Sequence, residues 1–212
     1  TISTGTINIL ETVKLFSPLT RVFISGSAMQ FKNNDHPIDE TTEFEASSPY
    51  SLARIHSVYA ARYYSKAFGL KIYVGYFFNH DSPLRTEQHV NQKIIRTVQR
   101  IISGSTEKLV LGNIEVKKEF NYAGDVVDAV WKLVNQDAVS EAIIGSGKAY
   151  AIKDWLAFCF SLKKLKWQKY TALQNNYVPE YRILVSNPGV IKGIGWEPKT
   201  DFYQLANMMM NE

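Results

Sequence analysis

The stretch Ser47–Arg85, SSPYSLARIHSVYAARYYSKAFGLKIYVGYFFNHDSPLR, decides the fold that we expect for this chain. Ser48 is a favoured N-cap, Pro49 suits the first helical position, and Gly69 suits the residue at which a helix ends. The mostly apolar, β-branched and aromatic run over residues 70–79 then predicts a buried strand. A helix that leads into such a strand, with polar residues at the strand's carboxyl end, is typical of an open α/β sheet that binds its ligand at that edge.

Two residues of the predicted helix form a candidate proton-transfer pair. Tyr50 and Arg54 are four positions apart, so their side chains lie on the same face of the helix. A fixed cation beside a phenol stabilises the phenolate, which makes a tyrosine a better group for accepting and returning a proton. We therefore predict that Tyr50 and Arg54 belong to an active centre.

The same stretch resembles the active-site helix and following strand of the extended short-chain dehydrogenase/reductases, and within them it is most similar to the GDP-mannose 4,6-dehydratases. That family carries a Tyr-x-x-x-Lys pair on the helix and ends the strand in Asn-His-Glu-Ser-Pro. Here the pair is Tyr50 and Arg54, and residues 79–83 read Asn-His-Asp-Ser-Pro. The resemblance runs from about Gly5 to Trp196. It implies NADP (or NAD) as cofactor, a GDP-sugar as substrate and a homo-oligomer.

The resemblance also implies roles for individual residues. Ser27 matches a threonine that hydrogen-bonds the sugar, and Met29 stands where the family has the glutamate that acts as base in dehydration. The expected catalytic residues are Ser27, Tyr50 and Arg54, of which Tyr50 and Arg54 would also contact the cofactor. No metal is expected. The expected substrate-binding residues, on the nucleotide side, are Asn79, Arg85, Lys93 and Lys118.

Three functions fit this sequence. The first is an enzyme of the dehydratase type that acts at C4 of a GDP-hexose. Because a thioether cannot take a proton, Met29 leaves open a second function, a GDP-sugar C4 reductase, dehydrogenase or epimerase without the dehydration step. The third belongs to another class: a non-catalytic GDP-sugar-binding or pairing protein in which both altered positions are eroded.

The expected fold class is α/β, the second half of a Rossmann-like parallel sheet followed by a smaller C-terminal substrate-binding lobe. Residues 1–85 are assigned to the NAD(P)-binding domain. Residues 86–212 are assigned to a mixed region, with the substrate lobe and the elements that return to the sheet. The sequence holds no Gly-x-Gly-x-x-Gly after a strand, and residues 5–11, GTINILE, match the segment that comes after the first half of the sheet in the family. We therefore expect roughly a hundred residues to precede the chain in an intact enzyme.

Other segments show the periodicity of strands and helices. Residues 21–27 (RVFISGS), 109–113 (LVLGN) and 142–144 predict strands. Residues 87–104 predict an amphipathic helix with an apolar face of Val90, Ile94, Val98, Ile101 and Ile102. Residues 123–136 predict a helix whose core residues are Val126, Val127, Val130, Trp131 and Val134.

Composition narrows the classes of function. The net charge of +4 is small and the basic residues are scattered, which disfavours a nucleic-acid-binding surface. The single cysteine, Cys159, lies in an apolar segment, where we expect it to be buried; one cysteine allows no intrachain disulfide, which fits the cytoplasm. No run of residues reaches the length of a membrane span, and no signal peptide is recognised.

Overall fold

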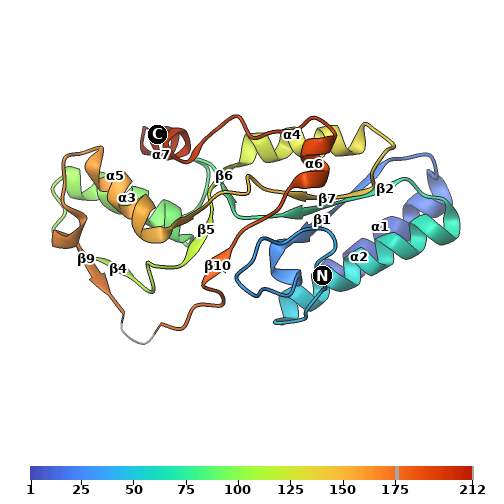
Figure 1. Cartoon of the computed structure of the whole chain (residues 1–212), viewed down its shortest axis with the longest axis horizontal. Helices are drawn as coiled ribbons and strands as arrows, with labels where there is room; N and C mark the ends of the chain where they lie inside the picture. Colours follow the sequence, from blue (N-terminus) through green and yellow to red (C-terminus); the bar gives the residue numbers. More distant parts are fainter. Residues whose placement is uncertain (175–176, 212) are drawn as a thin grey trace.

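The computed structural model describes residues 1–174 and 177–211, and a three-stranded parallel sheet lies at its centre (Figure 1). The strands are β1 (Val22–Ser27), β2 (Ile72–Phe77) and β7 (Glu141–Ile144), in the order β1-β2-β7. Every pairing in this sheet is parallel. The predicted α/β class is confirmed. Strands β1, β2 and β7 correspond to the strands predicted at residues 21–27, 70–79 and 142–144.

Helix α2 (Pro49–Phe68) begins and ends where the sequence predicts. The Oγ atom of Ser48 accepts a hydrogen bond from the Ser51 amide at 3.1 Å, which satisfies one of the free N–H groups of the first turn. Gly69 ends the helix with φ of 68°, in the left-handed region that glycine enters without strain. The helix therefore ends at a fixed residue, three positions before β2 begins at Ile72.

Alternating side chains of the sheet pack against helices on both of its faces. Helices α1 (Ile2–Phe16) and α2 cover one face, to which β2 contributes Val74. Helices α4 (Ala123–Val134) and α6 (Gly189–Gly193) cover the other face, to which β2 contributes Tyr73. Figure 1 shows the two helix layers on opposite sides of the sheet. Because β2 is buried on both faces, its sequence is a continuous apolar run rather than an alternating one.

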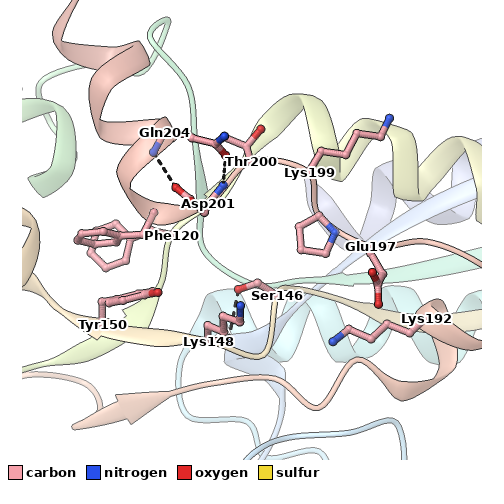
Figure 2. Close-up of a pocket in the computed structure, with 12 residues that line it drawn as sticks. Phe120, Ser146, Lys148, Tyr150, Lys192, Glu197, Lys199, Thr200, Asp201 and Gln204 are labelled. Carbon is pink, nitrogen blue, oxygen red and sulfur yellow. Dashed lines mark hydrogen bonds between the residues drawn. The ribbon is translucent and has the colours of Figure 1, made fainter.

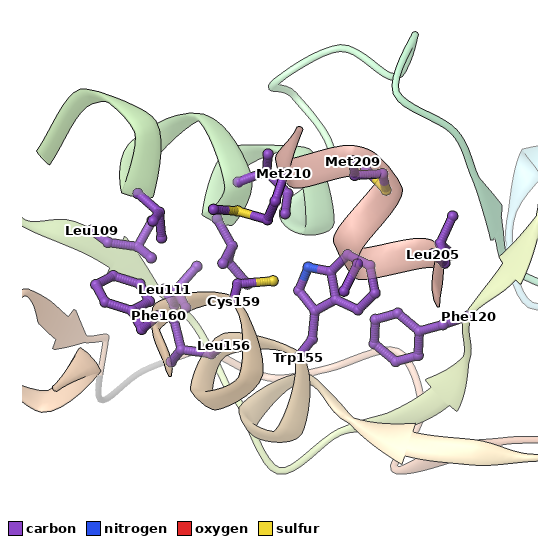
Figure 3. Close-up of a cluster of buried hydrophobic side chains, with 14 of the residues drawn as sticks. Leu109, Leu111, Phe120, Trp155, Leu156, Cys159, Phe160, Leu205, Met209 and Met210 are labelled. Atoms are coloured by element: carbon purple, nitrogen blue, oxygen red, sulfur yellow. The ribbon is translucent and has the colours of Figure 1, made fainter. Parts of the chain in front are cut away.

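A second hydrophobic cluster lies away from the sheet, between α3 (Val90–Ile102), α5 (Ile152–Ser161) and α7 (Phe202–Met210). Figure 3 shows its centre, where Trp155 and Phe120 lie close to Cys159 and the residues of α7. Trp155 and Cys159 have no exposed surface, so the expected burial of the cysteine is confirmed. The two short strands β4 (Leu109–Leu111) and β9 (Thr171–Leu173) pair in parallel at its edge, near the 3₁₀-helix η2 (Trp167–Lys169).

Short strands connect this cluster to the sheet. Strand β5 (Lys117–Glu119) pairs in parallel with β10 (Ile183–Leu184) and antiparallel with β8 (Ala149–Ala151). Strand β3 (His80–Asp81) pairs in parallel with β6 (Asn121–Tyr122). The chain crosses between the two regions several times, because α4, β7 and α6 return to the sheet after α3 and β5.

The structure corrects two of the helix predictions. Helix α3 begins at Val90 rather than at residue 87, and Ile102, expected on its apolar face, is 51% exposed. On α4, Val127 is 65% exposed and Trp131 is 70% exposed, although the sequence predicts both in the core. A helix packed on a sheet buries one stripe, which here contains Val126, and residues one position away rotate toward solvent. In the described part of the chain no helix is long and apolar enough to span a membrane.

Gly75 is required at the centre of the sheet because a side chain there would meet both neighbouring strands. A Cβ atom at this position would lie 2.7 Å from the Phe23 ring and 2.8 Å from the Ile144 side chain. We predict that Gly75→Ala lowers the free energy of unfolding by about 1–3 kcal/mol, the usual effect of overpacking. Urea denaturation monitored by circular dichroism measures this change.

The matched control is Gly5→Ala in α1, where a Cβ would meet nothing within 4 Å. Alanine in a helix interior is expected to stabilise by about 0.5–1 kcal/mol relative to glycine. Equal stability of Gly75→Ala and the wild type would contradict the packing described here.

Candidate active site

A cavity of about 410 Å³ lies at the carboxyl ends of β1 and β2. Its lining contains most of the residues that the sequence singled out: Ser27, Met29, Tyr50, Arg54, Asn79 and Arg85. They come from the end of β1, the first turns of α2 and the segment after β2. The polar residues of two separate strands meet here because parallel strands place their carboxyl ends at one edge of the sheet.

Tyr50 and Arg54 form the expected pair on α2. The Nε atom of Arg54 donates a hydrogen bond to the Tyr50 hydroxyl at 3.2 Å, and the guanidinium lies 5.2 Å from the centre of the tyrosine ring. The Nη1 atom of Arg54 donates to the carbonyl oxygen and to Oγ of Ser25, each at 2.7 Å. The guanidinium is therefore fixed against the end of β1, and Tyr50 remains 44% exposed toward the cavity side.

Ser27 ends β1 and caps a short 3₁₀-helix, η1 (Ala28–Gln30). Its Oγ atom accepts a hydrogen bond from the Met29 amide at 3.2 Å, and its own amide donates to Oε1 of Gln30 at 2.8 Å. A serine hydroxyl that accepts one bond still has its proton to donate. Met29 packs partly against the core of the sheet and brings no acid or base to the cavity.

An ion pair between a buried carboxylate and a partly exposed arginine lies beside the cavity. Asp81 is 5% exposed, and its Oδ1 atom lies 3.3 Å from Nε of Arg85. Its Oδ2 atom accepts a hydrogen bond from Nδ2 of Asn91 at 2.5 Å. Arg85 therefore lines the cavity, and its guanidinium is paired with the carboxylate of Asp81.

Several buried polar atoms without a hydrogen-bond partner belong to this ion pair and to residues of β6, of the segment after β2 and of the start of α3. Such atoms are rare in native proteins, and a group of them indicates a place for a ligand or ordered water. Sequence reasoning named Asn79 and Arg85 and quoted Asp81, but it missed the three amide residues Asn91, Gln92 and Asn121. The atoms are Oδ1 of Asn79, Oδ1 of Asp81, Nε of Arg85, Oδ1 of Asn91, Oε1 of Gln92 and Oδ1 of Asn121.

The two predicted lysines lie in different places. Lys93 lines a separate hollow of about 340 Å³, where its Nζ atom donates to the Val110 carbonyl at 2.7 Å. The structure therefore does not bring Lys93 into the cavity that holds Tyr50. Lys118 is 8% exposed on β5, and burial lowers the pKa of its amine. Its surroundings include Asp81 and Arg85.

The carboxylate of Glu119, next to Lys118 in β5, positions one wall of the site. Glu119 has no exposed surface, and its oxygens accept hydrogen bonds from the amides of Ser146 and Ser186, each at 2.6 Å. It also accepts from Nδ2 of Asn121 at 3.0 Å. The same Nδ2 atom donates to the carbonyl oxygen of Asn79 at 2.9 Å, so the carboxylate holds the backbone at this cavity residue through Asn121.

Another hollow, of about 390 Å³, lies between the start of α7 and the turn after β7 (Figure 2). Three exposed lysines from separate segments line it, Lys148, Lys192 and Lys199. The Nζ atom of Lys199 forms an ion pair with Oδ2 of Asp128 at 2.9 Å. None of the predicted site residues lines it. In the described residues no group of three His, Cys, Asp or Glu side chains is placed to hold a metal ion.

The parallel sheet with a polar cavity at its carboxyl edge defines an α/β protein of the nucleotide-binding type. Solved structures of this kind are similar to the chain. RMD from Pseudomonas aeruginosa complexed with NADPH aligns with a TM-score of 0.89 at 19% identity, over 98% of this chain and 71% of that one. The dTDP-glucose 4,6-dehydratase from Bacillus anthracis in complex with NAD aligns with a TM-score of 0.86 at 20% identity, over 98% and 65%.

The chain belongs to the GDP-mannose 4,6 dehydratase family, whose profile matches residues 1–209. GDP-mannose 4,6 dehydratase 1 of Arabidopsis thaliana is 30% identical over 218 residues, which cover 100% of this chain and 60% of the relative. The human GDP-mannose 4,6 dehydratase is 30% identical over 169 residues, or 77% of this chain and 45% of the relative. The chain thus spans about three fifths of the length of the first of these relatives, and the family resemblance is confirmed.

Glu119 offers a test of how the site wall is held. In Glu119→Gln an amide NH₂ replaces one of two oxygens that face only donors, so at least one buried donor loses its acceptor. We predict a loss of about 1–3 kcal/mol in the free energy of unfolding, the usual cost of an unsatisfied buried group. Denaturant titration measures it.

The matched control for this test is Glu115→Gln. Glu115 lies close by in sequence, but its side chain is 65% exposed and pairs only with Lys153 at 2.9 Å. Its replacement should leave stability within about 0.5 kcal/mol of the wild type. A similar loss in both variants would show that burial of the Glu119 carboxylate is not the cause.

Proposed function

We propose that the protein is an NAD(P)-dependent nucleotide-sugar enzyme that acts at C4 of a GDP-hexose. One observation carries this proposal: Ser27, Tyr50 and Arg54 line a single cavity at the carboxyl edge of a parallel sheet. Membership of the GDP-mannose 4,6 dehydratase family supports the substrate class. The NADPH and NAD complexes of structurally similar proteins support the cofactor class.

The residues of the cavity fit the reactive end of such a complex. When bound, the nicotinamide would accept or supply the hydride at C4. Tyr50, whose phenol is partly exposed and hydrogen-bonded by Arg54, would take the proton from the C4 hydroxyl or return it. Ser27 would donate its free hydroxyl proton to the same oxygen. Arg54 would keep Tyr50 oriented and stabilise its phenolate.

The nucleotide side of the site would be formed by Asn79, Arg85 and Lys118. Arg85 lines the cavity with a guanidinium suited to a diphosphate, since its planar fork can donate two hydrogen bonds to one phosphate. Lys93 lies in a neighbouring hollow and would contact a part of the nucleotide farther from the sugar.

Met29 favours a second candidate within the same fold, a GDP-sugar C4 reductase, dehydrogenase or epimerase. Dehydration between C5 and C6 needs a base and an acid, and the thioether supplies neither. Oxidation or reduction at C4 needs only the tyrosine and the cofactor. A non-catalytic GDP-sugar-binding or pairing protein is the alternative of another class.

A homo-oligomer in the cytoplasm completes the proposal. Apolar side chains on the outer surfaces of α1 and α2 are well exposed, among them Ile9 (54%), Leu52 (57%) and Tyr63 (60%). An uncovered apolar helix pair of this kind fits a second copy of the same chain. Sedimentation equilibrium gives the mass in solution, and a monomer at every concentration would contradict this part.

A product assay separates the enzymatic candidates. The protein is incubated with NADP and GDP-mannose, or with NADPH and a GDP-4-keto-6-deoxyhexose, and the products are identified by mass spectrometry. We expect hydride transfer at C4 and little or no loss of water from GDP-mannose, because Met29 stands at the position of the base. Abundant dehydrated product would favour the dehydratase instead, and no turnover with either pair would favour the binding protein.

Substitutions at the tyrosine and arginine test the catalytic assignment. Tyr50→Phe should lower kcat by about 10²–10⁴-fold, because it removes the group that moves the proton. Arg54→Lys should retain or raise activity, since lysine keeps the positive charge and is freed from the two bonds to Ser25. Steady-state kinetics measure both, with Tyr59→Phe, an exposed tyrosine on the same helix, as the matched control. Unchanged activity in Tyr50→Phe would remove Tyr50 from the mechanism.

A further inference from the structure

Ser25, near the carboxyl end of β1, lines the same cavity as Tyr50 and Arg54. Its Oγ atom accepts a hydrogen bond from Nη1 of Arg54 at 2.7 Å. Its carbonyl oxygen accepts a second hydrogen bond from the same nitrogen, also at 2.7 Å. One residue of the strand therefore holds this end of the guanidinium with both a side-chain and a backbone oxygen.

The two arginines in the middle of α2 are held by groups of different charge. Nη2 of Arg62 forms an ion pair with the carboxylate of Glu141 at 2.7 Å. Arg54 takes part in none of the ion pairs in the described part of the chain, and no aspartate or glutamate lines its cavity. Because the oxygens of Ser25 are neutral, they fix the position of the Arg54 guanidinium and leave its positive charge uncancelled. A nearby uncancelled cation is what stabilises a phenolate.

The guanidinium of Arg54 is shared between two neighbours. Its Nε atom donates to the Tyr50 hydroxyl at 3.2 Å, and its Nη1 atom donates to Ser25. A guanidinium is a rigid plane on a flexible stem, so contacts at two of its nitrogens fix the orientation of the whole group. The bonds to Ser25 are the shorter ones, and short bonds from a charged donor are the stronger ones. Ser25 therefore decides where the cation lies relative to Tyr50.

A nucleotide in the cavity would compete for an arginine that is not held. Guanidinium groups bind phosphate oxygens strongly, because their planar fork donates two parallel hydrogen bonds. Arg85, the proposed contact for the diphosphate, lines the same cavity as Arg54. Without the bonds to Ser25, the Arg54 side chain could turn toward the diphosphate, and Tyr50 would lose its cation.

We propose that Ser25 is a positioning residue, which holds Arg54 beside Tyr50 and so allows an arginine to support proton transfer by this tyrosine. The proposal rests on the function proposed above for Tyr50. It gives the two bonds to Ser25 a purpose beyond stability, since they direct a cation without neutralising it. Only the Oγ atom can be removed by substitution, so the tests act on that atom.

NMR of the arginine side chains tests the hydrogen bonds in the free protein. A guanidinium that is held by acceptors rotates slowly about its Cζ–N bonds, and the Arg54 signal is identified by its absence in Arg54→Lys. Ser25→Ala should make this rotation several-fold faster, whereas Ser25→Thr, which keeps a hydroxyl, should leave it slow. Ser140→Ala is the matched control, because Ser140 is an exposed serine just before β7, at the opposite edge of the sheet.

Steady-state kinetics and GDP binding test the consequence for proton transfer. With the substrate and cofactor pair that is turned over, Ser25→Ala should lower kcat about tenfold, since one charged hydrogen bond is lost. Its Kd for GDP, measured by isothermal titration calorimetry, should stay at the wild-type value or fall, because the released guanidinium is attracted to the diphosphate. Ser25→Asp should hold Arg54 firmly in the NMR measurement and still lower kcat, because a carboxylate cancels the charge.

A double variant shows whether Ser25 acts through Arg54. In the presence of Arg54→Lys, which removes the guanidinium that Ser25 holds, Ser25→Ala should change kcat by less than about twofold. An equal loss with and without Arg54→Lys would show that Ser25 acts by another route, and would overturn the proposal.

The outcomes also separate this inference from the proposed function. Unchanged guanidinium rotation or unchanged kcat in Ser25→Ala would overturn the role of Ser25 and leave the proposed function standing. Absence of turnover by the wild type would overturn the proposed function and the role of Ser25 in it, while the rotation rate would still show whether Ser25 holds Arg54. Ser25→Asp keeps the test decisive where Ser25→Ala fails to fold, because it separates a held arginine from an active one.

Discussion

The structure of the site depends on the buried carboxylate of Glu119. It collects amides from the turn after β7 and from the segment after β10, and through Asn121 it reaches the backbone of Asn79. These segments are far apart in sequence, and the carboxylate joins them through their amides. A full set of donors is also what makes a completely buried carboxylate tolerable. Gly145 leaves room for it, because a Cβ there would lie 2.6 Å from its Oε2 atom.

Lys118, the residue before Glu119 on β5, lies in different surroundings. Lys118 and Glu119 point to different faces of β5, and in the described part of the chain the ion pairs include none with Lys118. Buried polar atoms that lack partners occur at Asp81 and Arg85, and also at Ser186 beside Glu119.

Arg54 and Met29, which differ from the family pattern, each have a definite place in the structure. Arg54 keeps the cation beside Tyr50 that the family pattern requires, but its longer planar group reaches Ser25 and is held there by two hydrogen bonds. Met29 turns part of its side chain into the core of the sheet. The proposed chemistry centres on C4 because the tyrosine and a neighbouring cation are both present, while the thioether of Met29 cannot act as an acid or base.

The sequence by itself determined the local features: the capped helix α2, the buried run of β2, the spacing of Tyr50 and Arg54, and the family. The local features follow from short-range rules of capping, periodicity and spacing, which act within a few residues, whereas the family follows from the resemblance of residues 47–85 to its motifs. Tertiary structure alone decided that Val127 and Trp131 face solvent, that Lys93 lines a different hollow from Arg85, and that Asn91 binds Asp81. Which side of a helix is buried, and which polar groups share one site, depends on contacts between segments many residues apart, and no local pattern encodes them.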